Sequence, residues 1–305
     1  MVDRIPAILT VALLFGGGTS RVCHAGGACD ETSRLARMAC VAGVTDDFSI
    51  GKGNCMNLAD AAARQQCVAD ARDARTEAQQ LCRDQSHARQ DLCDALGQDP
   101  YDPAINPNEF LSPQATAANP NPYFPLVPGT TRVFKGGGQT DTVTVTNQTK
   151  TIQGVTTMVV QDDVVDDASS RLVETTQDFF AQTANGAVWY FGEITQSISE
   201  EGLISTDGSF LAGVDGGKAG IIMQATPQVG DVYRQEFSLG NAEDAAEVTS
   251  TTGSASVPGA SCSGNCVVTR EFTPLEPDGD EQKFYAAGIG VILDIDPDGT
   301  RSELQ

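Results

Sequence analysis

The chain has 305 residues, of which 40% are hydrophobic, and a formal net charge of −22. This length suggests about two domains, and from Tyr123 onward nine Lys or Arg residues face twenty-six Asp or Glu residues. A field of this sign repels phosphate backbones and anionic lipid surfaces, so we expect no nucleic-acid partner and favour a cation, a small ligand or a basic protein instead.

Residues 1–25 have the pattern of a secretion signal peptide. Arg4 provides a basic start, residues 5–15 form an apolar run, and small residues lead to a cleavage site after Ala25. The run is about half of the ~20 residues that span a bilayer, so we expect no integral membrane span. The sequence therefore predicts an exported protein with a periplasmic, extracellular or cell-surface destination.

Cleavage after Ala25 would leave eight of the nine cysteines and only one histidine, His87. An even number of cysteines in an exported chain indicates disulfides. With a single histidine, histidine-rich metal sites and Ser-His-Asp hydrolysis are disfavoured, and we expect no cofactor.

Residues 26–97 are predicted to be a Cys-rich helical segment that folds into a disulfide-stapled hairpin. Glycines in 43–54 predict a loop, so we expect one helix from about Glu31 to Ala42 and another from Asn54 to Leu96. Cysteines eleven or twelve positions apart on one helix are too distant to pair, so the disulfides must cross between helices.

The predicted loop favours an antiparallel register that joins Cys40 to Cys55 and Cys29 to Cys67. Cys82 and Cys93 would then be free thiols or would support covalent self-association of the protein. A second register, with a turn near 74, remains as the alternative: Cys55 with Cys93 and Cys67 with Cys82.

Residues 98–130 are predicted to be a Pro-rich strap or linker. The stretch from Pro100 to Gly129 holds eight of the fourteen prolines, and each proline fixes its own φ and disfavours helix in the residue before it. We expect its last part, 123–127, to dock apolar side chains on the domain that follows.

Residues 131–305 are predicted to form an antiparallel β-domain, either a curved sheet or a barrel-like one, which makes the whole chain α+β. Asn185-Gly186 between two apolar runs is the strongest hairpin signal. Cys262 and Cys266 flank a Ser-Gly-Asn turn and are predicted to form a local disulfide in a loop. The predicted strands are 140–146, 155–160, 172–180, 187–194, 220–223, 232–237, 267–272, 283–285 and 289–295.

Several runs of the β-domain resemble a largely uncharacterised family of exported bacterial proteins. The runs are NPYFPLVPGTTRVF, AVWYFGE, VGDVYRQEF, AEDAAEV and REFTPLEPDGDEQKFYAAGIGVI. The resemblance covers about residues 100–305, and weakly 55–97, and it implies export, Cys-bearing helices and a β-domain. It implies no activity and no catalytic residues. Two departures are Arg132, where an aromatic is expected, and the Cys262/Cys266 pair.

Two acidic motifs are candidate cation sites. Asp294, Asp296 and Asp298, followed by a glycine, match the start of a calcium-binding loop. No glutamate follows at the twelfth position, so a Pro-Asp-Gly turn is the favoured interpretation and calcium the alternative. The acidic run 162–167 is interpreted as a solvated strand end or turn, again with a weak cation site as the alternative.

A third group of polar residues in the β-domain could perform acid–base chemistry without histidine. The strand period places Arg234 and Glu236 on one face, with Tyr233 on the other. A cross-strand charge ladder on a solvent face is the competing interpretation. The catalytic candidates are Glu193, Arg234, Glu236, Lys283 and Tyr285.

The sequence as a whole favours an exported, non-catalytic binding or envelope-associated protein, whose acidic β-domain recognises a small ligand, a cation or a partner. The alternatives are a carboxylate-based extracellular hydrolase or lyase and a calcium-dependent adhesion module.

Overall fold

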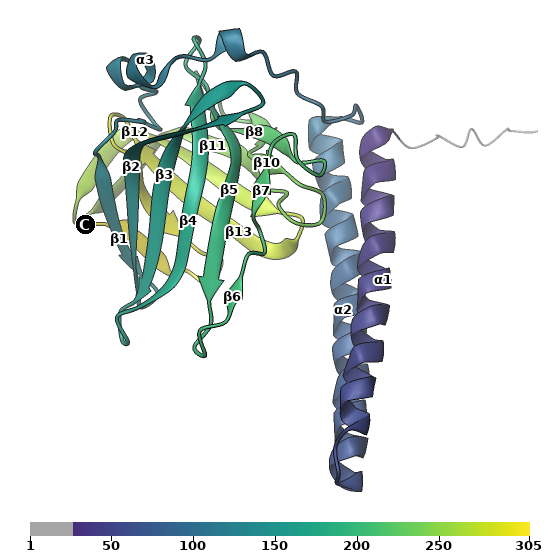
Figure 1. The fold of residues 1–305 in the computed structure, drawn as a ribbon. Helices are drawn as coiled ribbons and strands as arrows, with labels where there is room; N and C mark the ends of the chain where they lie inside the picture. The colour runs from purple at the N-terminus through teal and green to yellow at the C-terminus, as the bar shows by residue number, and fades with distance from the viewer. Residues whose placement is uncertain (1–26) are drawn as a thin grey trace, which may run out of the picture.

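The computed structural model describes residues 27–305 and shows an α+β protein. A helical hairpin stands beside a large, strongly curved antiparallel sheet and projects well beyond it (Figure 1). The predicted signal peptide lies outside the described residues. Among residues 27–305, no helix is long and apolar enough to cross a bilayer.

The hairpin consists of α1 (Ala28–Met56) and α2 (Ala61–Leu96). The predicted loop at 43–54 is wrong, because α1 continues through its glycines and the chain turns only at 57–60. A glycine inside a helix costs about 1 kcal/mol relative to alanine, which tertiary packing can offset. Asp60 caps α2, since its side chain accepts a hydrogen bond of 2.7 Å from the Ala63 N–H.

The later turn also changes the disulfide register. Both predicted pairings, Cys29–Cys67 and Cys40–Cys55, are wrong, because Cys40 and Cys55 lie on the same continuous helix. Cys82 and Cys93 are engaged within the chain, so they are not the free thiols that covalent self-association would need. Three disulfides join α1 to α2: Cys29–Cys93, Cys40–Cys82 and Cys55–Cys67.

The sulfur atoms themselves form much of the core of the hairpin. Cys55, Cys82 and Cys93 are almost fully buried, together with Leu92, whereas apolar side chains such as Met38 remain exposed. Two helices with so little buried apolar area gain modest stability from packing, so the cross-links stabilise the hairpin.

The Pro-rich strap contains two short helices, η1 (Pro107–Glu109) and α3 (Pro113–Ala118), and each begins at a proline, the residue favoured at the first helical position. Phe110 packs edge-on against Phe191 on the outer face of the sheet, with ring centroids 5.3 Å apart.

The predicted docking of the end of the strap is confirmed. Phe124 contacts Phe180 on the inner face, with ring centroids 5.0 Å apart, and Leu126 is 1% exposed. The strap therefore contacts the outer face with its first half and the inner face with its second.

The sheet is antiparallel throughout and confirms the predicted fold class. Its strand order is β10-β8-β5-β4-β3-β2-β1-β15-β14-β13-β12-β11-β9, with β6 and β7 paired to β5. The predicted hairpin at Asn185-Gly186 joins β4 to β5. The strands are β1 (Thr131–Gly136), β2 (Gln139–Ile152), β3 (Val155–Asp166), β4 (Arg171–Gln182), β5 (Val188–Ile198), β6 (Ile204–Ser205), β7 (Phe210–Leu211), β8 (Lys218–Met223), β9 (Val232–Arg234), β10 (Glu236–Phe237), β11 (Ala245–Val257), β12 (Ala260–Thr273), β13 (Glu276–Ala286), β14 (Gly290–Ile295) and β15 (Arg301–Leu304).

The sheet curls until its two edge strands, β9 and β10, meet at a single residue, Gln235, but it is not closed by a continuous ladder. At this point the N–H groups of Gln235 and Glu236 both donate to the Asp244 carbonyl, which is the geometry of a β-bulge. Gly220 of β8 lies directly against the Gln235 backbone, and any Cβ at position 220 would collide with it.

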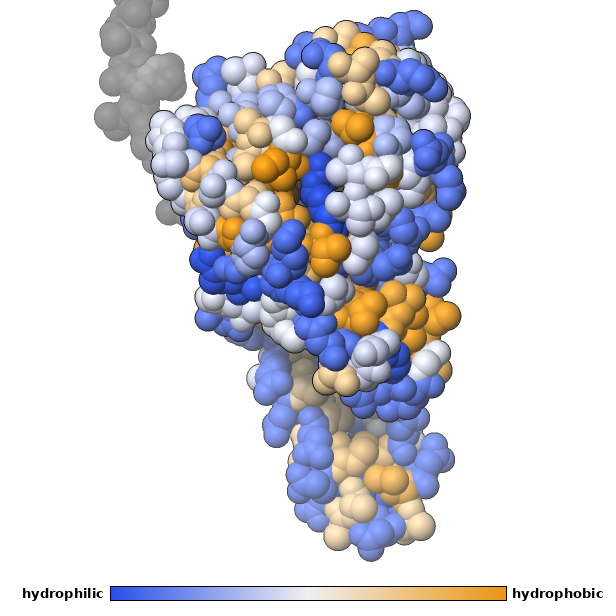
Figure 2. All heavy atoms as spheres, turned by 90° about the vertical axis from the view of Figure 1, so that its left-hand side faces the viewer, coloured by the Kyte–Doolittle hydropathy of each residue, from blue (hydrophilic) through white to orange (hydrophobic). Residues whose placement is uncertain are grey.

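The predicted disulfide between Cys262 and Cys266 is confirmed. It lies within β12 rather than in a loop before a strand, and it spans an irregularity where Cys266 pairs with Gly253 and Ser263 pairs with Ser254. The side of the molecule that carries β1 and the C-terminus has a largely polar surface interrupted by several apolar groups, the most extensive of which lies near the lower end of the sheet (Figure 2).

Candidate functional site

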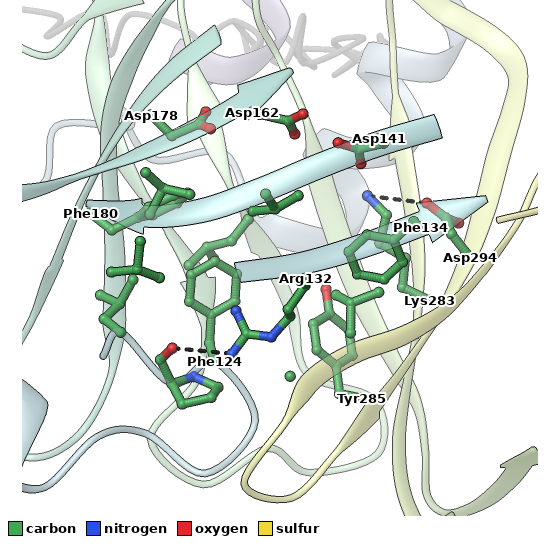
Figure 3. A pocket seen from close by; sticks show the side chains of 18 of the residues that line it. Phe124, Arg132, Phe134, Asp141, Asp162, Asp178, Phe180, Lys283, Tyr285 and Asp294 are labelled. Atoms are coloured by element: carbon green, nitrogen blue, oxygen red, sulfur yellow. Dashed lines mark hydrogen bonds and ion pairs between the residues drawn. The ribbon is translucent and has the colours of Figure 1, made fainter. Parts of the chain in front are cut away.

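The inner face of the sheet and the end of the strap enclose a cavity of about 320 Å³ (Figure 3). Its apolar wall includes the rings of Phe124, Phe180 and Tyr190, and the last two stack with centroids 4.8 Å apart. The cavity lies within the size range of small-molecule sites, which combine apolar walls with a few polar groups.

Three carboxyl groups form a row along this cavity: Asp141 on β2, Asp162 on β3 and Asp178 on β4 (Figure 3). Side chains alternate between the faces of a strand, and each aspartate shares its face with a buried or half-buried apolar residue two positions away. The register pairs Val143 with Asp162 and Val160 with Asp178, so the row crosses the three strands diagonally.

The surroundings of this row favour protonated carboxyl groups. Burial, reinforced by the neighbouring Asp162, raises the pKa of Asp141 to about 9. Burial also raises the pKa of Asp178 to about 8, although the Tyr190 hydroxyl donates a hydrogen bond of 2.6 Å to its Oδ1 and opposes the shift. At neutral pH, Asp141 and Asp178 therefore favour their protonated forms.

A cationic side chain, Lys283 on β13, lies across the cavity from this row. Its Nζ is 2.9 Å from Glu271 Oε2 and 3.8 Å from Asp294 Oδ2, and the Tyr285 hydroxyl donates to Glu271 Oε1 at 2.6 Å. Burial alone would raise the pKa of Glu271, but the charge of Lys283 and these hydrogen bonds hold it below its ordinary value. Lys283 is thus neutralised by its neighbours.

Arg132 lines the same cavity near Phe124 and Tyr285 (Figure 3), and its Nη2 donates to the Pro125 carbonyl at 3.4 Å. Burial lowers the pKa of Arg132, but a guanidinium remains charged at any physiological pH. One side of the cavity is therefore rich in carboxyl groups, and another part carries a positive charge.

A second hollow, of about 300 Å³, adjoins the first and shares Glu271 and Lys283 with it. Glu193 and Glu236 line this hollow together with Lys283, so three of the predicted catalytic candidates converge. Burial raises the pKa of Glu193 to about 7, and burial together with the nearby Asp244 raises that of Glu236 well above its ordinary value.

The predicted placement of Arg234 beside Glu236 is wrong. The bulge at Gln235 interrupts the strand period, so Tyr233 joins the inner core while Arg234 lies on the outer side against the Phe237 ring, 4.6 Å from its centroid. Tyr285, the fifth candidate, lines the first cavity.

The favoured Pro-Asp-Gly turn is present, since the Gly299 N–H donates to the Asp296 carbonyl at 2.9 Å, and the alternative calcium motif does not form one site. Asp294 faces Lys283 in the cavity, whereas Asp298 accepts the Thr300 N–H at 2.8 Å in the turn beyond the strand. Within residues 27–305, no group of three or more His, Cys, Asp and Glu side chains is arranged to hold a metal ion.

The sequence interpretation missed Asp141 and Asp178 and assigned Asp162 to a solvated strand end, although Asp162 lies on the inner face of β3. The sequence did contain one signal: each aspartate lies two positions from an apolar residue of its own strand, namely Val143, Val160 or Phe180. Residues two positions apart lie on the same face of a strand.

Comparisons of the chain with protein-family models, with curated proteins and with solved structures found no match. The resemblance to exported bacterial proteins therefore depends on the sequence runs alone.

Proposed function

We propose that the protein is an exported, non-catalytic binding protein whose sheet interior holds a small organic cation, specifically a primary amine carried on an apolar body. The observation that carries this proposal is the row of Asp141, Asp162 and Asp178 in one cavity with the rings of Phe180 and Tyr190. Carboxyl groups and aromatic faces both attract cations, and the attraction is strongest where water is excluded.

The protonation of the row supports a cation as the ligand. Asp141 and Asp178 hold protons because, among the residues that the structure describes, no positive charge lies close enough to stabilise their ionised forms. An ammonium group placed between them would supply that charge and lower both pKa values. Binding would therefore release protons, and affinity would rise with pH until the pKa values of the free protein, about 8 and about 9, are passed.

The test compares phenethylamine with phenylacetate by titration calorimetry in two buffers of different ionisation enthalpy. We expect the amine to bind this cavity with release of protons. Asp162→Asn keeps the shape of the cavity but removes the central acidic group of the row, so it should weaken amine binding at least tenfold. Asp163→Asn is the matched control, because Asp163 lies on the opposite face of β3, where it accepts from Thr175.

Two results would contradict the proposal. One is binding of the amine without proton release in either buffer. The other is an equal affinity in the Asp162→Asn and Asp163→Asn variants.

Export is supported by the predicted signal and by the four disulfides, because such bonds persist in oxidising compartments. N-terminal sequencing of the mature protein should find a start at Gly26, and a cytosolic protein with alkylatable thiols would contradict export.

A carboxylate-based hydrolase or lyase is the second candidate, because Glu193, Glu236 and Lys283 share one hollow. A glutamate whose pKa is raised to about 7 can act as a general acid at neutral pH. Turnover of chromogenic glycosides or of polyuronates that is lost in Glu193→Gln would favour this candidate over the binding protein.

A further inference from the structure

A third cavity, of about 470 Å³, lies where the helical hairpin meets the sheet. Its walls come from the first turns of α1, the last turns of α2, residues 99–103 and strands β5, β8, β9 and β10. It shares no residue with the amine cavity proposed above.

Two arginines, Arg89 of α2 and Arg234 of β9, line this cavity and are only 5% and 8% exposed. Arg89 binds Glu243 through Nε at 2.9 Å and Nη2 at 2.7 Å, and Glu243 also accepts the Gly240 N–H at 2.7 Å. The charge of Arg89 is therefore neutralised, but its Nη1 is buried and has no hydrogen-bond partner in the described part of the chain.

Arg234 makes no ion pair of its own within residues 27–305, although Glu243 lies close enough to favour its charged form. It stacks on the rings of Phe237 and Tyr101, at 4.6 and 5.5 Å from their centroids. Its Nη1 is also buried without a partner. A buried donor without a partner costs about 1–3 kcal/mol, and more when it is charged, so a group that accepted from it would bind favourably.

The charge and the walls of the cavity define the ligand. Arg89, Glu243 and Arg234 together carry one uncompensated positive charge, while Asp99 at the rim is exposed to solvent. A monoanion matches this charge, and a phosphate group, with about two negative charges at neutral pH, does not.

We propose that this cavity binds a small carboxylic acid, with its carboxylate at the Nη1 atoms of Arg89 and Arg234 and its apolar body against Trp189 and Ile221. The guanidinium is planar and presents donors in the geometry that a carboxylate accepts. The remaining wall, formed by Leu96 and Phe237, is also apolar and suits an alkyl or phenyl body.

Trp189 is the only tryptophan of the chain and lines the cavity, so its fluorescence reports on occupancy. The probes are octanoate and octylamine, which have the same chain length and opposite charge. We expect octanoate, but not octylamine, to change Trp189 fluorescence saturably. Arg234→Met should weaken octanoate binding at least tenfold, and Arg234→Lys, which keeps the charge but loses the planar fork, should weaken it less.

Circular dichroism of each variant establishes that it is folded. The Asp162→Asn variant of the interior cavity should bind octanoate as the wild type does, so a failure of the interior amine site would leave this result unaffected. The proposal is overturned if octanoate does not bind at millimolar concentration, or if folded Arg234→Met binds it with unchanged affinity. It is also overturned if octylamine binds this cavity equally well.

Discussion

Asp178→Asn should change how the stability of the sheet depends on pH. Asp178 is buried on the inner face of β4, and its pKa is raised from an ordinary 3.8 to about 8. Between these values the folded protein keeps the proton, while the unfolded chain releases it. Because the folded pKa is raised, the contribution of this group to stability is complete below pH 3.8 and is lost as pH rises through the folded pKa.

The size of the effect follows from linkage. A group that is protonated only in the folded state costs about 1.4 kcal/mol of unfolding free energy per pH unit, or about 3 kcal/mol between roughly pH 5 and pH 7. Asparagine has the shape of the protonated acid and can still accept the bond from the Tyr190 hydroxyl, which is 2.6 Å from Oδ1. The variant should therefore gain stability relative to wild type by about this amount over the same interval.

The assay is urea unfolding at roughly pH 5 and pH 7, monitored through the fluorescence of Trp189. This residue is the sole tryptophan of the chain and lies in β5, so its fluorescence reports on the sheet. The control is Asp73→Asn, at an exposed position of α2. If the stability difference between Asp178→Asn and wild type is the same at both pH values, the proposed protonation of the inner row is wrong.

Three further substitutions test the structural framework. Replacing both Cys40 and Cys82 by alanine removes a cross-link between residues 42 positions apart and should destabilise the hairpin by about 2–4 kcal/mol, measured by helical circular dichroism on heating; unchanged melting would contradict the role given to the disulfides. Arg89→Met leaves Glu243 buried without its partner and should cost about 3–5 kcal/mol in urea unfolding, and adding Glu243→Leu should recover most of it. Leu126→Ala opens the end of the inner core and should cost about 2–5 kcal/mol in the same assay; a smaller loss would mean that the strap packs loosely there.

The sequence was most informative where local rules apply. Proline spacing located the strap between 98 and 130, and alternation with an Asn-Gly turn located β4 and β5. The prediction contained no strand for β11, whose second half is rich in Ser, Thr and Gly and has few apolar residues. Such a strand forms because its neighbours β9 and β12 pair with it, and that information is not local.

The two main errors have one cause each. The glycines of 43–54 predicted a loop, but the disulfide between Cys40 and Cys82 holds α1 against α2 through this region. This one wrong loop changed every cysteine pairing within the hairpin. Strand alternation placed Arg234 beside Glu236, but the bulge at Gln235 exists because the two sheet edges meet there. Neither the cross-links nor the meeting of the edges can be read from local sequence.

The order of strands in the sheet has a consequence for how the protein acquires its structure. The first strand of the sheet, β1, pairs with the last, β15, and β15 in turn pairs with β14. Two halves built from successive hairpins are thus joined by a four-residue segment, Arg301–Leu304, that is synthesised after all the others. Contacts between such distant segments slow folding. We therefore expect the inner cavity to form only after β15 has paired with β1 and β14. A ligand of the interior would then bind the finished sheet rather than guide its assembly.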